Sequence, residues 1–278
     1  MKKFSSFLAI FMTAIFFGVF SSCSGSSDDS NNDEHKDNPQ KVVVDVNRVF
    51  TGGMPQKVNG IQSISYNSNG LVTEMQGEDG EKVTFEYSNV VTRSLDNVPR
   101  VRMTVYSNKN EYEILDMKLN KLGFVEKVVE QSYNLDGLRG NDSWNFKYNS
   151  DDQMEYMKRT EGGNEETFIT YKDGNIVNVK MTSEEVDNKH DYKIYYTSTD
   201  IVEPYVNKGC VMLFDATFGI DLDEMKYAYY AGLLGKSTSN LPVGMYDGEK
   251  QVKYNWQFNS IGYPTKVITE DGTIIFQW

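Results

Sequence analysis

The stretch Phe168-Ile169-Thr170-Tyr171-Lys172-Asp173-Gly174-Asn175-Ile176-Val177 contains an alternating run, an Asp-Gly pair and a return to aliphatic residues. Alternation with a period of two is typical of a β-strand with one buried face. Asp and Gly both tolerate the left-handed backbone conformations that a tight hairpin turn requires. The stretch therefore predicts an antiparallel β-hairpin.

The same order of residues recurs along the chain: an aromatic or aliphatic strand end, a polar turn, and an aliphatic residue that starts the next strand. The copies occupy residues 66–72, 119–125, 148–154, 171–177 and 258–264. In this pattern the strand-end residue fills the core just before the chain reverses. A regular series of hairpins gives a meander of neighbouring strands, roughly a dozen or more at the usual strand length.

A sheet with that many strands must curl, split or close. Thr84, Glu86, Asn145 and Lys147 alternate with apolar residues, so one side of the sheet faces water rather than lipid. We therefore expect residues 41–278 to form a single all-β domain. Its strands form an antiparallel meander of hairpins, which makes a water-soluble barrel or a strongly curved sheet.

Residues 209–236 break this pattern and predict a short helical insertion. Asp221 and Glu224 have the spacing of a capping box, and Gly235 supplies a stop. Apolar residues follow at helical spacing, namely Leu222, Met225, Ala228, Tyr229 and Leu233. The insertion is either a plug that fills one end of the sheet or a mobile lid over a pocket.

The hairpin copies, the segment 232–242 (GLLGKSTSNLP) and the closing stretches Trp256-Gln257-Phe258 and 274–278 (IIFQW) together resemble a Bacteroidetes lipoprotein family. That family is a domain of unknown function with a porin-like fold, and the resemblance covers roughly residues 42–278. The hairpins alone also resemble the Tyr-Asp repeats of secreted toxin shells. The resemblance implies a fold but no activity and no site residues.

The N-terminus predicts export. Lys2 and Lys3 precede an apolar run at 4–20, and no basic cluster follows it, which indicates a cleaved signal peptide over residues 1–22 rather than a membrane span. Cys23 follows small residues, as in the lipobox of bacterial lipoproteins, although Phe20 stands where that family usually has Leu. The resemblance implies that Cys23 is lipidated and anchors the chain to a membrane.

Residues 23–40 predict a flexible tether, because the segment 24–34 contains no apolar residue. Acidic residues directly after a lipidated cysteine resemble the export signal of Bacteroidetes surface lipoproteins. We therefore expect a lipid-anchored protein of the outer membrane, exposed on the cell surface, with the periplasmic face as the alternative.

Composition excludes several classes of function. A net charge of −12 opposes binding to nucleic acid. With only two histidines, and without a phosphate-binding loop or a nucleophile motif, the sequence indicates no catalytic residue and no cofactor. Cys210 lies in an apolar run and is expected to be a small buried hydrophobe.

Acidic residues offer weak candidates for metal binding. Asp221 and Asp223 with Glu224, and Asp151 with Asp152, lack the spacing of a calcium loop. We assign them to a helix cap and a turn, so the sequence predicts no metal site.

Three functions remain open. The first is a non-catalytic binding or accessory protein for a glycan, a nutrient or a protein partner, with Trp144, Trp256 and Trp278 as candidate stacking residues. The second is a carrier or envelope-assembly factor with an apolar pocket, gated by residues 209–236. The third is a glycoside hydrolase with a carboxylate pair, for which the sequence singles out no pair. The oligomeric state stays open.

Overall fold

The computed structural model describes residues 44–58, 60–77, 80–88, 100–107, 110–160, 163–184 and 190–278. The predicted signal peptide, Cys23 and the tether lie outside this part of the chain. All described residues belong to one compact unit, Pro39–Trp278.

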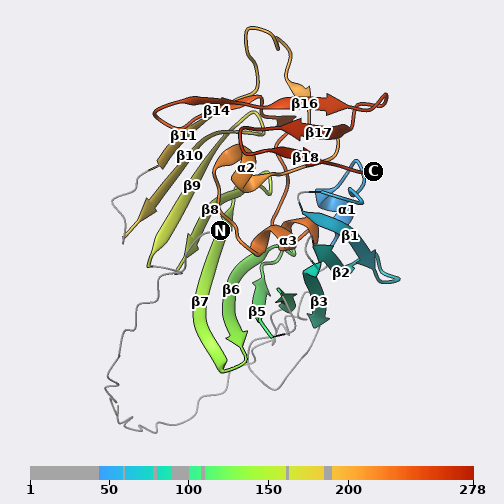
Figure 1. The fold of residues 1–278 in the computed structure, drawn as a ribbon, viewed down its shortest axis with the longest axis vertical. Helices are drawn as coiled ribbons and strands as arrows, with labels where there is room; N and C mark the ends of the chain where they lie inside the picture. The colour runs from blue at the N-terminus through green and yellow to red at the C-terminus, as the bar shows by residue number, and fades with distance from the viewer. Residues whose placement is uncertain are drawn as a thin grey trace, which may run out of the picture. The chain divides into compact units, whose positions relative to one another are not determined.

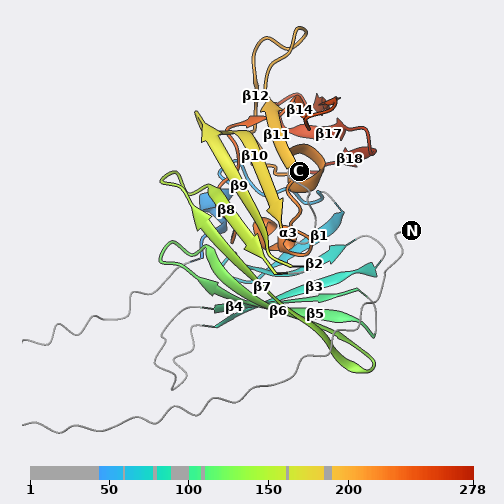
Figure 2. The same cartoon turned by 90° about the vertical axis from the view of Figure 1, so that its left-hand side faces the viewer.

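Thirteen strands form one antiparallel sheet in which neighbours along the chain pair from β1 to β11, followed by β14 and β15. Figures 1 and 2 show this sheet bending around the elements near the C-terminus. The predicted meander and strong curvature are therefore confirmed. The strands are β1 (Ile61–Tyr66), β2 (Val72–Gly77), β3 (Lys82–Ser88), β4 (Arg100–Tyr106), β5 (Tyr112–Leu119), β6 (Val125–Asn134), β7 (Gly137–Tyr148), β8 (Met154–Arg159), β9 (Glu165–Lys172), β10 (Asn175–Ser183), β11 (His190–Tyr195), β14 (Gly244–Tyr246) and β15 (Gln251–Lys253).

Two smaller sheets complete the described strands. One pairs β12 (Tyr205–Val206) with β13 (Asn240–Leu241), and the other contains β16 (Asn255–Phe258), β17 (Pro264–Ile268) and β18 (Thr273–Ile275). The end strands of the large sheet, β1 and β15, do not pair with each other in the described residues, so the sheet is curved rather than closed into a barrel. Among the described helices, none has the length and apolar character needed to cross a membrane.

The repeat seen in the sequence is also a repeat of backbone geometry. In all five copies the strand pairing shifts register next to the strand-end residue, as at a β-bulge. In four of the five turns an asparagine at the same position accepts hydrogen bonds from two backbone N–H groups. These asparagines are Asn67, Asn120, Asn149 and Asn259.

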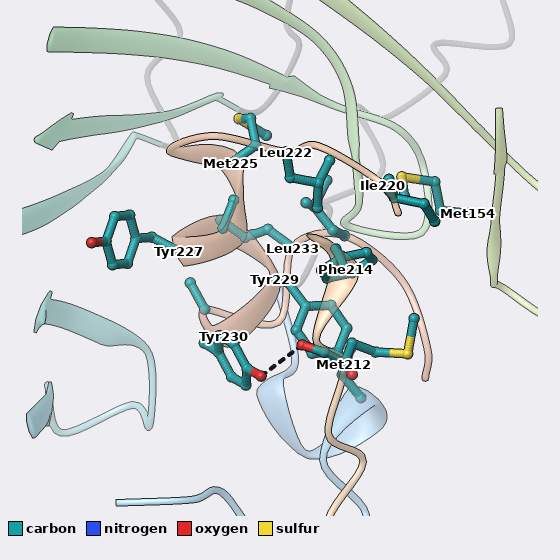
Figure 3. Packing of buried hydrophobic residues seen from close by; sticks show 14 of the residues in the cluster. Met154, Met212, Phe214, Ile220, Leu222, Met225, Tyr227, Tyr229, Tyr230 and Leu233 are labelled. Carbon is teal, nitrogen blue, oxygen red and sulfur yellow. Dashed lines mark hydrogen bonds between the residues drawn. The ribbon is translucent and has the colours of Figure 1, made fainter. Parts of the chain in front are cut away.

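Residues 209–236 pack against the inner face of the sheet, the face whose side chains join the main core. Leu222, Met225, Ala228, Tyr229 and Leu233, predicted from their helical spacing, are all buried. Figure 3 shows Tyr229 and Tyr230 beside Phe214 and Met212, and the Tyr230 hydroxyl donates to the Met212 carbonyl at 2.8 Å. The segment therefore fills the described interior with side chains, which favours the plug over the lid and argues against the carrier alternative.

The details of the insertion differ from the prediction. It holds two short helices, α2 (Phe214–Phe218) and α3 (Met225–Tyr230), and a third helix, α1 (Val46–Val49), precedes the sheet.

The predicted capping box at Asp221 is wrong: Glu224 is the residue before α3, and it makes no capping hydrogen bond through its side chain. The helix also ends before Gly235, because Gly232 already has a left-handed backbone with φ of 77°.

The reason for the missing cap lies on the neighbouring strand. The guanidinium of Arg159, on β8, binds the carboxylates of both Asp221 and Asp223. Asp223 also has a positive φ of 42°, which no α-helix accommodates. The Asp221 carboxylate accepts from the Asp223 N–H at 3.2 Å, so Asp221 shapes the turn before α3 instead of capping a longer helix.

Candidate ligand-binding groove

A groove of about 710 Å³ lies at the open edge of the large sheet, beside β1. This volume is within the range of roughly 300–1,000 Å³ that is usual for small-ligand sites. Its walls come from α1, the segment after α1, β1, the turn between β1 and β2, and the C-terminal segment. The lining residues are Val46, Asn47, Met54, Pro55, Gln56, Gln62, Ser63, Ile64, Tyr66, Gly70 and Gln277.

Tyr66 provides the aromatic surface of the groove. It lies opposite Val72, which is fully buried, so its side chain points to the inner face of the sheet. In the equivalent repeat positions Tyr148 and Tyr171 donate their hydroxyls to backbone carbonyls of the core at 2.7 and 2.9 Å. Tyr66 instead keeps 44% of its surface exposed, and partial burial raises the pKa of its hydroxyl.

Tyr66 thus departs from the packing role that the repeat predicts for a strand-end aromatic. At this edge of the sheet no further strand covers it among the described residues. The ring is therefore held by a rigid hairpin and still offered to solvent, which are the two conditions for a stacking surface.

Four carboxamides converge on the same groove: Asn47, Gln56, Gln62 and Gln277. The backbone positions three of them, because the Asp45 carboxylate accepts from the Asn47 N–H at 3.0 Å and the Gln56 N–H donates to the Gln277 carbonyl at 2.8 Å. Each carboxamide offers both donors and acceptors of hydrogen bonds. The groove can therefore satisfy a ligand whose groups donate and accept at once, such as hydroxyls.

The three tryptophans predicted to stack on a ligand lie elsewhere. Trp144 and Trp256 are only 1% and 9% exposed, and their indole N–H groups donate to Glu130 and to the Pro242 carbonyl, each at 2.7 Å. Trp278 is half-buried against Tyr263 and donates to the Pro264 carbonyl. Because Trp144 and Trp256 pack in the core, they present no stacking surface, and the structure corrects that prediction.

Three carboxylates converge at a second place, on the inner face near α3. The carboxylate oxygens of Glu113, Glu130 and Glu224 lie within 4.8 Å of one another, and none of these residues lines the groove. Burial, reinforced by the negative charge of Glu113, raises the pKa of Glu224 to about 8. Glu224 therefore carries a proton at neutral pH, whereas a carboxylate must be deprotonated to bind a metal ion.

The acidic residues considered from the sequence have structural partners. Asp221 and Asp223 border a cavity of about 230 Å³ and both bind Arg159. Burial is the main factor that raises the pKa of Asp223.

Asp152 occupies a turn with φ of 67° and pairs with Arg48 and Lys236. Cys210 is buried as predicted.

The sequence did not reveal the groove because its residues are far apart along the chain. Asn47, Tyr66 and Gln277 come from a helix, a strand and the C-terminal segment. Backbone hydrogen bonds between Gln277 and residues 56–57 bring these parts together. The one available signal was that the first copy of the repeat begins with a tyrosine at the edge of the meander, where its neighbour on one side is missing.

The described fold is an open, curved antiparallel sheet with an internal plug and a polar groove at its edge. The chain belongs to the family described as a domain of unknown function (DUF4595) with porin-like fold, which it matches over residues 59–266. The suspected family is thereby confirmed. No curated protein matches the chain.

Two solved structures share the fold. A porin-like protein from Bacteroides uniformis has 15% sequence identity and a TM-score of 0.57, with 77% of this chain and 88% of that chain covered. A porin-like protein from Bacteroides vulgatus has 13% identity and a TM-score of 0.50, with 81% and 99% covered. At these identities the likeness extends to the fold alone.

Proposed function

We propose that the protein is a non-catalytic glycan-binding lipoprotein, anchored to the outer membrane through Cys23 and exposed on the cell surface. The ligand binds in the groove beside β1. The anchor rests on the sequence of the N-terminus, and the ligand class rests on the groove. The protein serves as a binding or accessory factor that holds a nutrient glycan near the cell.

The observation that carries the proposal is the meeting of an exposed tyrosine with four carboxamides in one groove. A sugar ring has apolar C–H faces and a rim of hydroxyls. Tyr66 offers a ring for the face, as aromatic side chains with a polar edge do at binding surfaces. The carboxamides pair with the hydroxyls, since each can donate and accept.

The same lining supports a non-catalytic role. Glycoside hydrolysis needs two carboxyl groups on either side of the scissile bond, and the residues that line the groove include no Asp or Glu. The carboxylates at Glu113, Glu130 and Glu224 are outside this lining. A sugar bound beside Tyr66 therefore meets no carboxyl group among the residues that line the groove.

The test uses the full-length protein, purified in a detergent without a sugar headgroup so that the detergent does not compete. A panel of oligosaccharides is screened by thermal shift, and each positive is titrated by calorimetry. We expect saturable binding that falls about two- to tenfold in Tyr66→Ala, because stacking contributes about 0.5–1.5 kcal/mol. Tyr195→Ala is the matched control, since Tyr195 is 38% exposed and lies outside the groove.

Mass spectrometry of the ligand after long incubation tests the non-catalytic role. The oligosaccharide should be recovered at its original length. Cleavage that disappears in Glu224→Gln or Asp223→Asn would replace the binding role with the hydrolase alternative. Failure of every glycan to bind would overturn the proposed function.

A further inference from the structure

We infer that the groove selects neutral glycans and rejects acidic ones, such as those that carry uronic acid or sulfate groups. This inference rests on the proposed function and defines its ligand class. Three features of the groove carry it: the neutral lining, the positions of the nearest basic residues and the net charge of the chain.

The first feature is the lining. Its eleven described residues include hydroxyl, carboxamide and apolar side chains, and none is charged. A carboxylate or sulfate on a bound sugar loses water on entering the groove, and this loss costs free energy unless a cation compensates it. Removing hydroxyls from water costs less free energy, because carboxamides replace the hydrogen bonds that water supplied.

The second feature is the direction of the nearest basic side chains. Arg48 is part of α1, but its guanidinium donates to the Asp152 carboxylate at 2.8 Å and to the Leu122 carbonyl at 3.0 Å. Lys57 follows Gln56 and forms a β-bridge with Gln277, yet it is absent from the lining. The groove therefore receives the side chain of Gln56 but not that of Lys57.

The third feature is the net charge of −12, which repels an anionic polymer before contact. This long-range effect is screened by salt, with a Debye length of about 3 Å at 1 M. Selectivity that comes from the lining persists at high salt, because desolvation of a buried anion does not depend on screening. Salt therefore separates the two contributions.

The experiment compares matched oligosaccharides that differ only in charge: an oligogalactan and an oligogalacturonan of equal length and linkage. Binding to the full-length protein is measured by calorimetry at 0.15 M and 1 M salt. We expect the neutral chain to bind at least tenfold more tightly than the acidic chain at both salt concentrations. Equal or tighter binding of the acidic chain at 1 M salt would overturn the inference and leave the proposed function standing.

A charge variant locates the selectivity. Gln56→Lys places a cation in the groove, and we expect it to raise affinity for the acidic chain at least fivefold at 1 M salt. Gln251→Lys, at an exposed position on β15 outside the groove, adds the same charge and should leave affinity at 1 M salt unchanged. Equal effects of the two variants at 1 M salt would contradict selection by the lining. Failure of all glycans to bind would instead overturn the proposed function itself.

Discussion

The asparagine that begins four of the repeated turns acts through its side chain rather than through conformational freedom. Its side-chain oxygen accepts from the backbone N–H groups two and four residues later, at 2.9–3.1 Å in each case. A left-handed residue follows at the fourth position of the turn: Gly70, Gly123, Asp152 or Gly262. The asparagine thus supplies acceptors to N–H groups that the β-ladder leaves unpaired.

Asn120→Ala tests this role. The change removes the acceptor of the Leu122 and Phe124 N–H groups, and we expect it to lower the free energy of unfolding by about 1–2 kcal/mol. Urea denaturation followed by tryptophan fluorescence measures the change. Asn141→Ala, at an exposed position within β7, is the control and should change stability by less than about 0.5 kcal/mol. Equal losses in both variants would show that the turn asparagine has no special role.

At the scale of elements, α3 meets the sheet through a cluster of acids. Glu224 precedes α3, and it faces Glu113 from β5 and Glu130 from β6, with Asp223 beside it in the chain. Arg159 from β8 pairs with Asp223. The pKa of Glu224 is about 8, against an ordinary value of 4.5. Between pH 4.5 and about pH 8, Glu224 is therefore protonated in the folded chain and ionised in the unfolded chain.

The sign of the pH dependence follows from this difference. Because the unfolded state binds fewer protons in this interval, the free energy of unfolding falls as pH rises from about 4.5 to about 8. In Glu224→Gln the contribution is absent, so we expect the variant to be more stable than wild type at pH 9 by about 1–3 kcal/mol. Denaturation at pH 5, 7 and 9 measures this gain, with exposed Glu203→Gln as the control. A gain in stability that is equal at pH 5 and pH 9 would contradict the raised pKa of Glu224.

An element can be predicted from the sequence when the residues that determine it lie close together along the chain. The hairpins are predictable because alternation, Asp-Gly pairs and the turn asparagines all act within about ten residues. The core face of the insertion was also predictable from helical spacing. The start of α3 was not, because Arg159, distant in sequence, engages Asp221 and Asp223. Trp144 was misjudged for the same reason: its indole has a buried partner, Glu130, on a neighbouring strand.

At the scale of the unit Pro39–Trp278, the groove depends on how the segment before β1 meets the C-terminal segment. The Gln277 N–H donates to the Lys57 carbonyl at 3.1 Å, which ties the C-terminal segment to the residues before β1. Trp278, the last residue, occupies a space beside Gly209 that a Cβ atom would fill. The groove therefore forms only when the first hairpin, the segment before it and the C-terminal segment are all in place, and no single segment of sequence encodes it.

We expect the N-terminus to hold this unit at a membrane. If Cys23 carries the lipid, its sulfur is the covalent link between the β domain and the membrane, and Cys23→Ser removes that link without touching any described residue. We expect wild type to sediment with membranes and to incorporate a labelled fatty acid, because several acyl chains anchor a protein stably. Cys23→Ser carries no acyl chain, so we expect it to enter the soluble fraction unlabelled. Cys210→Ser is the control, since replacing this buried thiol should leave both the label and the membrane fraction unchanged.

Protease added to intact cells should digest the wild-type domain if it lies on the outer surface, and protection from protease would place it on the periplasmic side. Membrane retention of an unlabelled Cys23→Ser chain would mean that the apolar segment at 4–20 stays attached as an anchor, and the signal-peptide interpretation would then be wrong.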